Sequence, residues 1–172
     1  MNTTQRMNKD TIPTNFTLGL AIFDFVPVIL FCLLSIVLGL SFSSIIFIVG
    51  STMCFISGLL KVIWKIIVAT KKRNIWFMFI QMRIAMPIGL LIMIIGFIYY
   101  CFTNDVSIFF NSLLNPFVLV FLVLGVIGMI LMIIFAFKLD SSSVKSNWIE
   151  QITNSASQLF LFIGFLIALL IR

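Results

Sequence analysis

The chain has 172 residues, of which 62% are hydrophobic and only 9% are charged, and 11 Lys and Arg against 5 Asp and Glu give a net charge of +6. A soluble domain of this length carries about 25% charged and about 45–50% apolar residues. The composition therefore excludes a single soluble domain and indicates a protein that faces lipid. In lipid the backbone must satisfy its own hydrogen bonds, so only helices or closed barrels span. Residues 117–137 lack the alternation of barrel strands. We expect an all-α, polytopic helical membrane protein.

The predicted spans follow from length. A helix needs about 20 residues to cross about 30 Å of hydrocarbon. Residues 25–60 hold no charge and are too long for one crossing, and the small residues from Gly39 to Ser44 predict the turn between two spans. We predict five transmembrane helices in one domain over 1–172, after a cytoplasmic tail at 1–16. The predicted spans are about 17–40, 45–68, 84–102, 114–137 and 155–171.

The basic residues predict the orientation, because short cytoplasmic loops retain Lys and Arg. Ten of the 11 fall on one side of the predicted spans, and only Arg172 falls on the other. The ten are Arg6, Lys9, Lys61, Lys65, Lys71, Lys72, Arg73, Arg83, Lys138 and Lys145. We therefore expect the N-terminus in the cytoplasm and the C-terminus outside, in the plasma membrane of a prokaryote.

Aromatic residues at the span ends fit this orientation, since Trp and Tyr favour the membrane interface. Trp64, Trp76 and Trp148 fall at the predicted inner edge, and Tyr99 and Tyr100 at the outer edge. The positive charge thus indicates orientation and contact with anionic lipid, through Lys71, Lys72, Arg73 and Arg83, before it indicates nucleic-acid binding. A cleavable signal peptide is the rival interpretation of the first span, but the apolar stretch is too long and a second one follows at once.

Small residues recur at helical spacing and predict where the spans pack closely. Gly50, Cys54 and Gly58 follow at intervals of four in the second span, and Gly125 and Gly128 mark the fourth. Cys32 and Cys54 lie at similar depth, and we interpret them as small packing residues. The chain has no His and only five acids, so we expect no metal centre and no cofactor.

Polar groups at membrane depth are the candidates for function, because each costs about 2.5–3.5 kcal/mol near the bilayer centre without a partner. Asp24 lies about two turns into the first span, and Lys61 and Lys65 lie one turn apart on the second. We consider an ion pair from Asp24 to Lys61 or Lys65. The alternative places Asp24 in the headgroup zone, with both lysines reaching lipid phosphates.

A second polar cluster precedes the fifth span. Asn147, Gln151, Asn154 and Gln158 recur at helical spacing, and Glu150 and Ser157 extend their face. If this helix continues straight into the span, the polar stripe enters the membrane and lines a vestibule. If it bends, the stripe lies on the membrane surface.

These clusters support two hypotheses from different classes. The first is a small transporter, channel or transport-accessory subunit with a cytoplasm-facing polar cavity formed by Asp24, Lys61, Lys65, Glu150, Gln151, Asn154 and Gln158. The second is a non-transporting assembly, regulatory or partner-binding protein whose basic inner face contacts lipid. A homo-oligomer or another membrane protein fits either as partner. No nucleophile and base arrangement indicates an enzyme.

Overall fold

The computed structural model describes residues 17–140 and 143–172, and these residues contain seven helices and no strand. The helices are α1 (Leu18–Phe23), α2 (Phe25–Phe42), α3 (Ile45–Lys71), α4 (Trp76–Thr103), α5 (Ser107–Leu113), α6 (Pro116–Lys138) and α7 (Val144–Leu170). Within the described ranges, five helical stretches are long and apolar enough to span a membrane, α1 and α2 together making the first. The prediction of an all-helical, five-span protein is confirmed. The predicted tail at 1–16, with Arg6 and Lys9, lies outside the described residues.

The first span is interrupted at Asp24, between α1 and α2. Proline has no backbone N–H, and its ring crowds the carbonyl four residues earlier. Pro27 therefore leaves the carbonyl of Phe23 without its usual helical partner, and the chain turns at the next residue. Asp24 keeps a hydrogen bond from its own N–H to the carbonyl of Leu20, at 3.1 Å. The break places a carboxylate at a helix junction inside the span.

The turn between α2 and α3 is tighter than predicted, because Gly39 lies inside α2 and only Ser43 and Ser44 connect the helices. Ser43 takes a left-handed conformation (φ 47°), and its N–H donates to the carbonyl of Gly39 at 2.9 Å. The Ser44 hydroxyl accepts from the N–H of Phe47 and starts α3. The Arg172 guanidinium donates to the carbonyl of Ser41 at 2.8 Å, so the chain end lies beside this turn.

Two predicted helix starts shift in the structure, and one predicted loop contains a short helix. α4 begins at Trp76 and not at about 84, and α7 begins at Val144 and not at about 155. Both extensions are less apolar than the spans they continue, so hydropathy did not include them. The predicted loop at 103–113 contains α5, which at seven residues is too short to cross a membrane. The predicted start of the fourth span holds, since the Asn115 side chain accepts from the N–H of Phe117 and Pro116 occupies the first turn.

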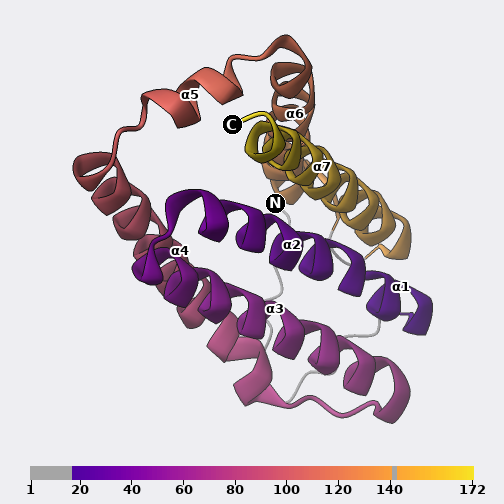
Figure 1. The fold of residues 1–172 in the computed structure, drawn as a ribbon. Coiled ribbons are helices and arrows are strands. Elements are labelled where there is room, and N and C mark those ends of the chain that lie inside the picture. The colour runs from indigo at the N-terminus through magenta and orange to yellow at the C-terminus, as the bar shows by residue number, and fades with distance from the viewer. Residues whose placement is uncertain (1–16, 141–142) are drawn as a thin grey trace.

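The long helices pack in the order α4, α3, α2, α7, α6, so neighbours along the chain are mostly neighbours in space (Figure 1). α5 joins α4 to α6 at one end of the bundle (Figure 1). Small residues bring the backbones together as predicted. A Cβ added to Gly50 would lie 2.6 Å from the backbone nitrogen of Met93 in α4, and one added to Gly128 would lie 2.7 Å from Ser157 in α7.

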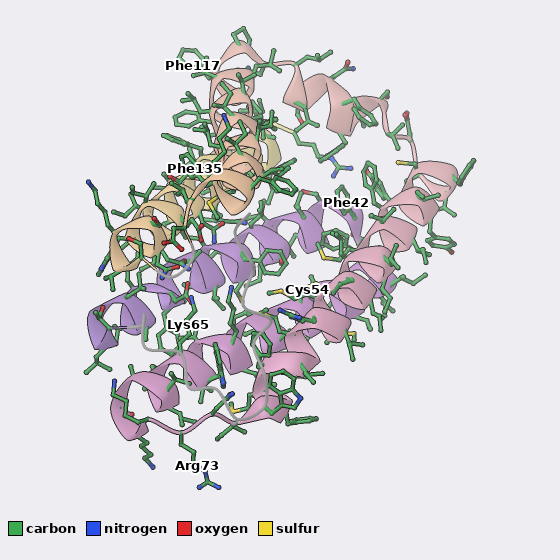
Figure 2. All side chains as sticks on the ribbon, turned by 180° about the vertical axis from the view of Figure 1, so that it is seen from behind. Phe42, Cys54, Lys65, Arg73, Phe117 and Phe135 are labelled. Atoms are coloured by element: carbon green, nitrogen blue, oxygen red, sulfur yellow. The ribbon has the colours of Figure 1, made fainter. Side chains whose placement is uncertain are left out.

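The bundle has two ends along its helix axes, and these ends differ in chemistry. At the end that holds the α2–α3 turn, the rings of Phe42, Phe47, Tyr100 and Phe109 form a buried cluster. Arg73 lies at the opposite end from Phe42 and Phe117 (Figure 2). Trp64, predicted to face the interface, is only 2% exposed and donates to the Asn74 side chain at 3.1 Å. It closes the α3–α4 loop because the helical continuation at Trp76 folds over it.

Candidate functional site

An ion pair links the first two spans inside the bundle. The Asp24 carboxylate contacts the Lys65 ammonium of α3, and the two residues are 3% and 5% exposed. The pair follows from the break at Pro27, which leaves Asp24 at the α1–α2 junction facing α3. The ion pair that we considered from the sequence is therefore present, to Lys65. The alternative with Asp24 in the headgroup zone is not supported by its burial.

Asp24 also lines a cavity of about 480 Å³, which we call the Asp24 cavity. It is surrounded by the α1–α2 junction and by α2, α3, α4 and α7. Its polar lining consists of Asp24, Lys61, Asn154 and Gln158. Four of the seven residues predicted to form a polar cavity thus lie around one space. Its apolar lining consists of Pro27, Val28, Phe31, Cys54, Phe55, Gly58, Met86, Pro87, Leu90 and Met93.

The polar stripe reaches this cavity because α7 is one continuous helix over Val144–Leu170. Of the two alternatives that we considered, a helix that continues straight into the fifth span and one that bends onto the membrane surface, the structure has the first. The Oε1 atom of Gln158 is buried and has no hydrogen-bond partner among the described residues. Leaving an amide oxygen buried without a partner destabilises the folded protein by about 1–3 kcal/mol. The oxygen is enclosed by the protein, so a molecule in the cavity does not reach it without a rearrangement of the side chain.

The remaining three candidates, Lys65, Glu150 and Gln151, are not among the residues that line the cavity. Lys65 is held by Asp24, and Glu150 lies close enough to Lys65 and Lys61 to attract both electrostatically. Gln151 is 8% exposed, and its Oε1 atom also lacks a partner among residues 17–140 and 143–172. The two cations and two acids balance, so the region carries no net charge when all four are ionised.

Not all of the stripe serves this cavity. Ser157, which we placed on the polar face, is 1% exposed and donates to the carbonyl of Gly125 in α6, at 2.7 Å. Its role is to hold α6 against α7, where Gly128 also leaves room for it. Asn147 is buried near the start of α7. The stripe therefore divides between the cavity and the α6–α7 interface.

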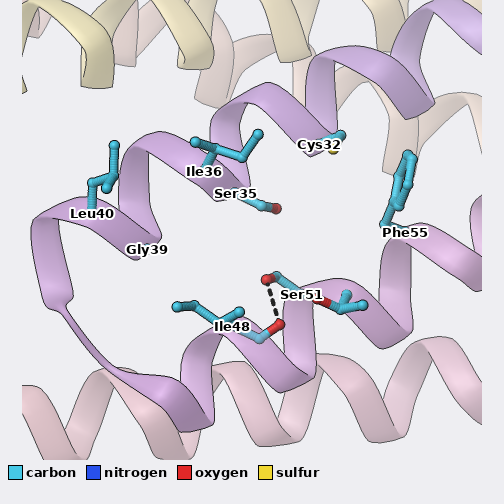
Figure 3. A pocket seen from close by; sticks show the side chains of 9 residues that line it. Cys32, Ser35, Ile36, Gly39, Leu40, Ile48, Ser51 and Phe55 are labelled. Carbon is cyan, nitrogen blue, oxygen red and sulfur yellow. Dashed lines mark hydrogen bonds between the residues drawn. The ribbon is translucent and has the colours of Figure 1, made fainter.

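A second, mostly apolar space lies between α2 and α3, and we call it the Ser35 crevice (Figure 3). Its volume is about 240 Å³, and it is lined by Cys32, Ser35, Ile36, Gly39, Leu40, Ile48, Ser51, Thr52 and Phe55. Ser35 of α2 and Ser51 of α3 lie on facing sides of it (Figure 3). The Ser51 hydroxyl donates to the carbonyl of Ile48, whereas the Ser35 oxygen has no partner among the described residues.

The proposed anionic-lipid residues gather around the α3–α4 loop. Lys71, Lys72, Arg73 and Arg83 are all exposed. The Arg83 guanidinium lies 4.6 Å above the ring of Phe79, which holds it close to the loop. The structure thus brings the four cations to one end of the molecule.

Sequence reasoning missed the contribution of α4 to the cavity. Met86, Leu90 and Met93 supply only apolar surface, and nothing in an apolar span distinguishes them from lipid-facing residues. The Cys54 thiol lies 3.6 Å from the carbonyl oxygen of Met86, in hydrogen-bonding contact, and all three cysteines are free. Within the described ranges, no three Cys, Asp or Glu side chains gather as metal ligands.

No protein-family model, curated protein or solved structure matches the chain.

Proposed function

We propose that this chain is a small transporter, or the accessory subunit of a transport complex, that binds its solute in the Asp24 cavity. The observation that carries the proposal is the buried Asp24–Lys65 ion pair beside a cavity that also exposes Lys61, Asn154 and Gln158. Charged groups inside a membrane are costly and typically mark solute or proton pathways.

The geometry favours a binding step over an open channel. Farther along α2 and α3 lies the separate, mostly apolar Ser35 crevice, and the buried cluster around Phe42 and Tyr100 fills that end of the bundle. A continuous water path would need polar groups there. The protein would therefore bind at one side and move its solute through a conformational change.

By the distribution of basic loops, the cavity opens to the cytoplasm of a prokaryote and the chain resides in its plasma membrane. Five apolar helices make it a multi-pass membrane protein; the particular membrane and orientation belong to the proposal. An enzymatic role is not part of the proposal.

The experiment is a flux measurement in proteoliposomes, with protons, sodium, potassium and chloride as the probe solutes. We expect flux for at least one, reduced to the rate of protein-free liposomes by Asp24→Asn and lowered by Glu150→Gln. Asp105→Asn is the matched control, because that carboxylate is exposed outside the spans. Wild-type flux in Asp24→Asn would remove the ion pair from the mechanism.

The second candidate is a non-transporting assembly or regulatory protein that contacts anionic lipid or a partner through its basic end. The exposed group of Lys71, Lys72, Arg73 and Arg83 favours it. Absence of flux, together with co-purification of a membrane protein in constant ratio, would select this candidate over transport.

A further inference from the structure

Lys61 places a cation close to the middle of the second span. It lies three residues past Gly58, the midpoint of α3 (Ile45–Lys71), which is about 4.5 Å along the axis at about 1.5 Å per residue. The residue is half-buried, lines the Asp24 cavity and forms no ion pair within residues 17–140 and 143–172. A charge at this depth is costly unless a counter-charge or water compensates it. The cavity is the space in which a counter-charge can bind.

The acid in the same lining does not neutralise Lys61. Asp24 contacts Lys65, and its Oδ2 atom is enclosed. Glu150 attracts Lys61 electrostatically, but it is not among the lining residues. The lining thus presents one cation that no acid contacts, and this favours an anionic ligand over a cationic one.

The amides of the lining also favour a ligand that accepts hydrogen bonds. Asn154 and Gln158 lie one helical turn apart on α7, and both line the cavity. Because the Oε1 atom of Gln158 is enclosed, the group that this side chain can present to the cavity is its NH2. Asn154 carries a second NH2 group. A carboxylate, which only accepts hydrogen bonds, matches these donors and the Lys61 ammonium.

The rest of the wall determines the body of the ligand. Ten of the 14 lining residues are apolar, and they include the rings of Phe31 and Phe55 and the thioethers of Met86 and Met93. The volume of about 480 Å³ holds about 16 groups of the size of a water molecule, at about 30 Å³ each. A body with one ring or a short branched chain fits this space, whereas a long acyl chain exceeds it.

We propose that the Asp24 cavity binds a compact apolar carboxylate, whose carboxylate pairs with Lys61 and whose body packs against α4 and the rings of Phe31 and Phe55. The inference deepens the proposed function and rests on it for transport alone, in which this carboxylate is the solute.

The charge balance adds a specific consequence. Asp24, Lys61, Lys65 and Glu150 carry no net charge together, so a bound carboxylate adds one negative charge to the region. Glu150 therefore competes with the ligand for the attraction of Lys61. Removing the charge of Glu150 should tighten binding, which it would not do for a ligand held by apolar contacts alone.

The test measures binding of radiolabelled 3-phenylpropionate to the full chain in phosphatidylcholine nanodiscs at neutral pH, with binding to empty nanodiscs subtracted. We expect saturable binding. The neutral 3-phenylpropionamide and the cationic 3-phenylpropylamine should displace the label about tenfold more weakly than unlabelled 3-phenylpropionate, because the charge-assisted hydrogen bond is lost.

The competitors test each part of the ligand assignment. Equal displacement by the amide or the amine would overturn the pairing with a cation. Stronger displacement by acetate or by hexadecanoate would overturn the compact apolar body. Absence of saturable binding for both 3-phenylpropionate and 4-methylpentanoate would overturn the site itself.

Charge variants test the polar end. Lys61→Gln should weaken binding about tenfold to a hundredfold, whereas Lys71→Gln, exposed at the end of the same helix, should leave it unchanged. Glu150→Gln should tighten binding. Wild-type affinity in Lys61→Gln, or weaker binding in Glu150→Gln, would contradict the ion pair.

A matched pair of neighbours tests the apolar wall. Leu90 lines the cavity and is 54% exposed, whereas Leu91 is 59% exposed and is not in the lining. Leu90→Trp should occupy part of the cavity and abolish binding, and Leu91→Trp should leave it unchanged. Equal effects of the two substitutions would place the ligand elsewhere.

This inference and the proposed function fail separately. Asp24-dependent ion flux without binding of either carboxylate would refute this inference and leave transport standing. Lys61-dependent binding in a protein that moves neither ions nor 3-phenylpropionate would refute transport and retain the carboxylate site.

Discussion

Lys65 reaches Asp24 from the next span along the chain, and the two side chains form an ion pair that the bundle almost fully encloses. Removing one member of such a pair leaves a buried charge without compensation, which costs about 3–5 kcal/mol. We therefore expect Asp24→Asn and Lys65→Gln each to lower the free energy of unfolding by about that amount. Unfolding in mixed detergent micelles measures it.

The double variant Asp24→Asn with Lys65→Gln should recover most of the loss, because neither charge remains. Lys138→Gln is the control, since Lys138 is exposed at the end of α6 and surface substitutions change stability by about 0.5 kcal/mol or less. Additive losses in the double variant would mean that the two residues do not stabilise one another.

The close approach of α3 and α4 predicts a position-dependent effect of adding a methyl group. At Gly50 a Cβ would lie 2.6 and 2.7 Å from backbone atoms of Met93 and Gly89. Gly50→Ala should therefore separate the helices and destabilise the protein by about 1–3 kcal/mol. At Gly19 the nearest atom would be 3.9 Å away, on Trp148. Gly19→Ala should be neutral or stabilising by up to about 1 kcal/mol. Thermal unfolding measures the stability of both variants. Equal losses of stability in Gly50→Ala and Gly19→Ala would contradict the close packing of α3 against α4.

The spans were predictable because about 20 apolar residues in a row have few structural alternatives. The parts of the helices that we expected at the membrane interface were less predictable. Residues 76–83 and 144–154 continue α4 and α7, yet their mixed composition fits a surface helix equally well. Their course depends on contacts such as Trp64 with Phe79, whose ring centroids are 5.2 Å apart.

The candidate site was predictable in its polar part and not in its shape. Asp24 and Gln158 stood out because polar groups are rare at that depth. The Ser35 crevice depends on where α2 and α3 touch, at Gly39 and Gly58, and a lone sequence does not specify which faces meet. For the same reason Ser157 could be assigned to the polar face but not to α6.

Asp105 predicts a pH effect outside the spans. Its carboxylate accepts a hydrogen bond from the N–H of Ser107 at 2.9 Å, just before α5. The hydrogen bond from the Ser107 side chain and, after it, this backbone bond lower the pKa of Asp105 below that of an ordinary aspartate. Stabilisation of the start of α5 is thus complete above the unfolded pKa and disappears as the pH falls through the lowered folded pKa.

Carboxyl-carbon NMR of the protein in micelles, over pH 2 to 6 (roughly the range around a carboxyl pKa), measures this titration. We expect a midpoint below that of the free amino acid, and Ser107→Ala should move it partly back while keeping the backbone bond. An Asp105 midpoint above the ordinary value would contradict the hydrogen bond.

The orientation predicts which loops a reagent reaches from outside the cell. The α3–α4 loop carries Lys71, Lys72 and Arg73, whereas the segment from Asn104 to Val106 carries no basic residue. In a background with Ser at positions 32, 54 and 101, Asp105→Cys should react with a membrane-impermeant maleimide on intact cells. Lys72→Cys should react only after permeabilisation. Because the two positions flank opposite ends of α4, they report on one helix. Labelling of Lys72→Cys in intact cells would invert the protein and open the Asp24 cavity to the exterior, so that the solute would bind from outside.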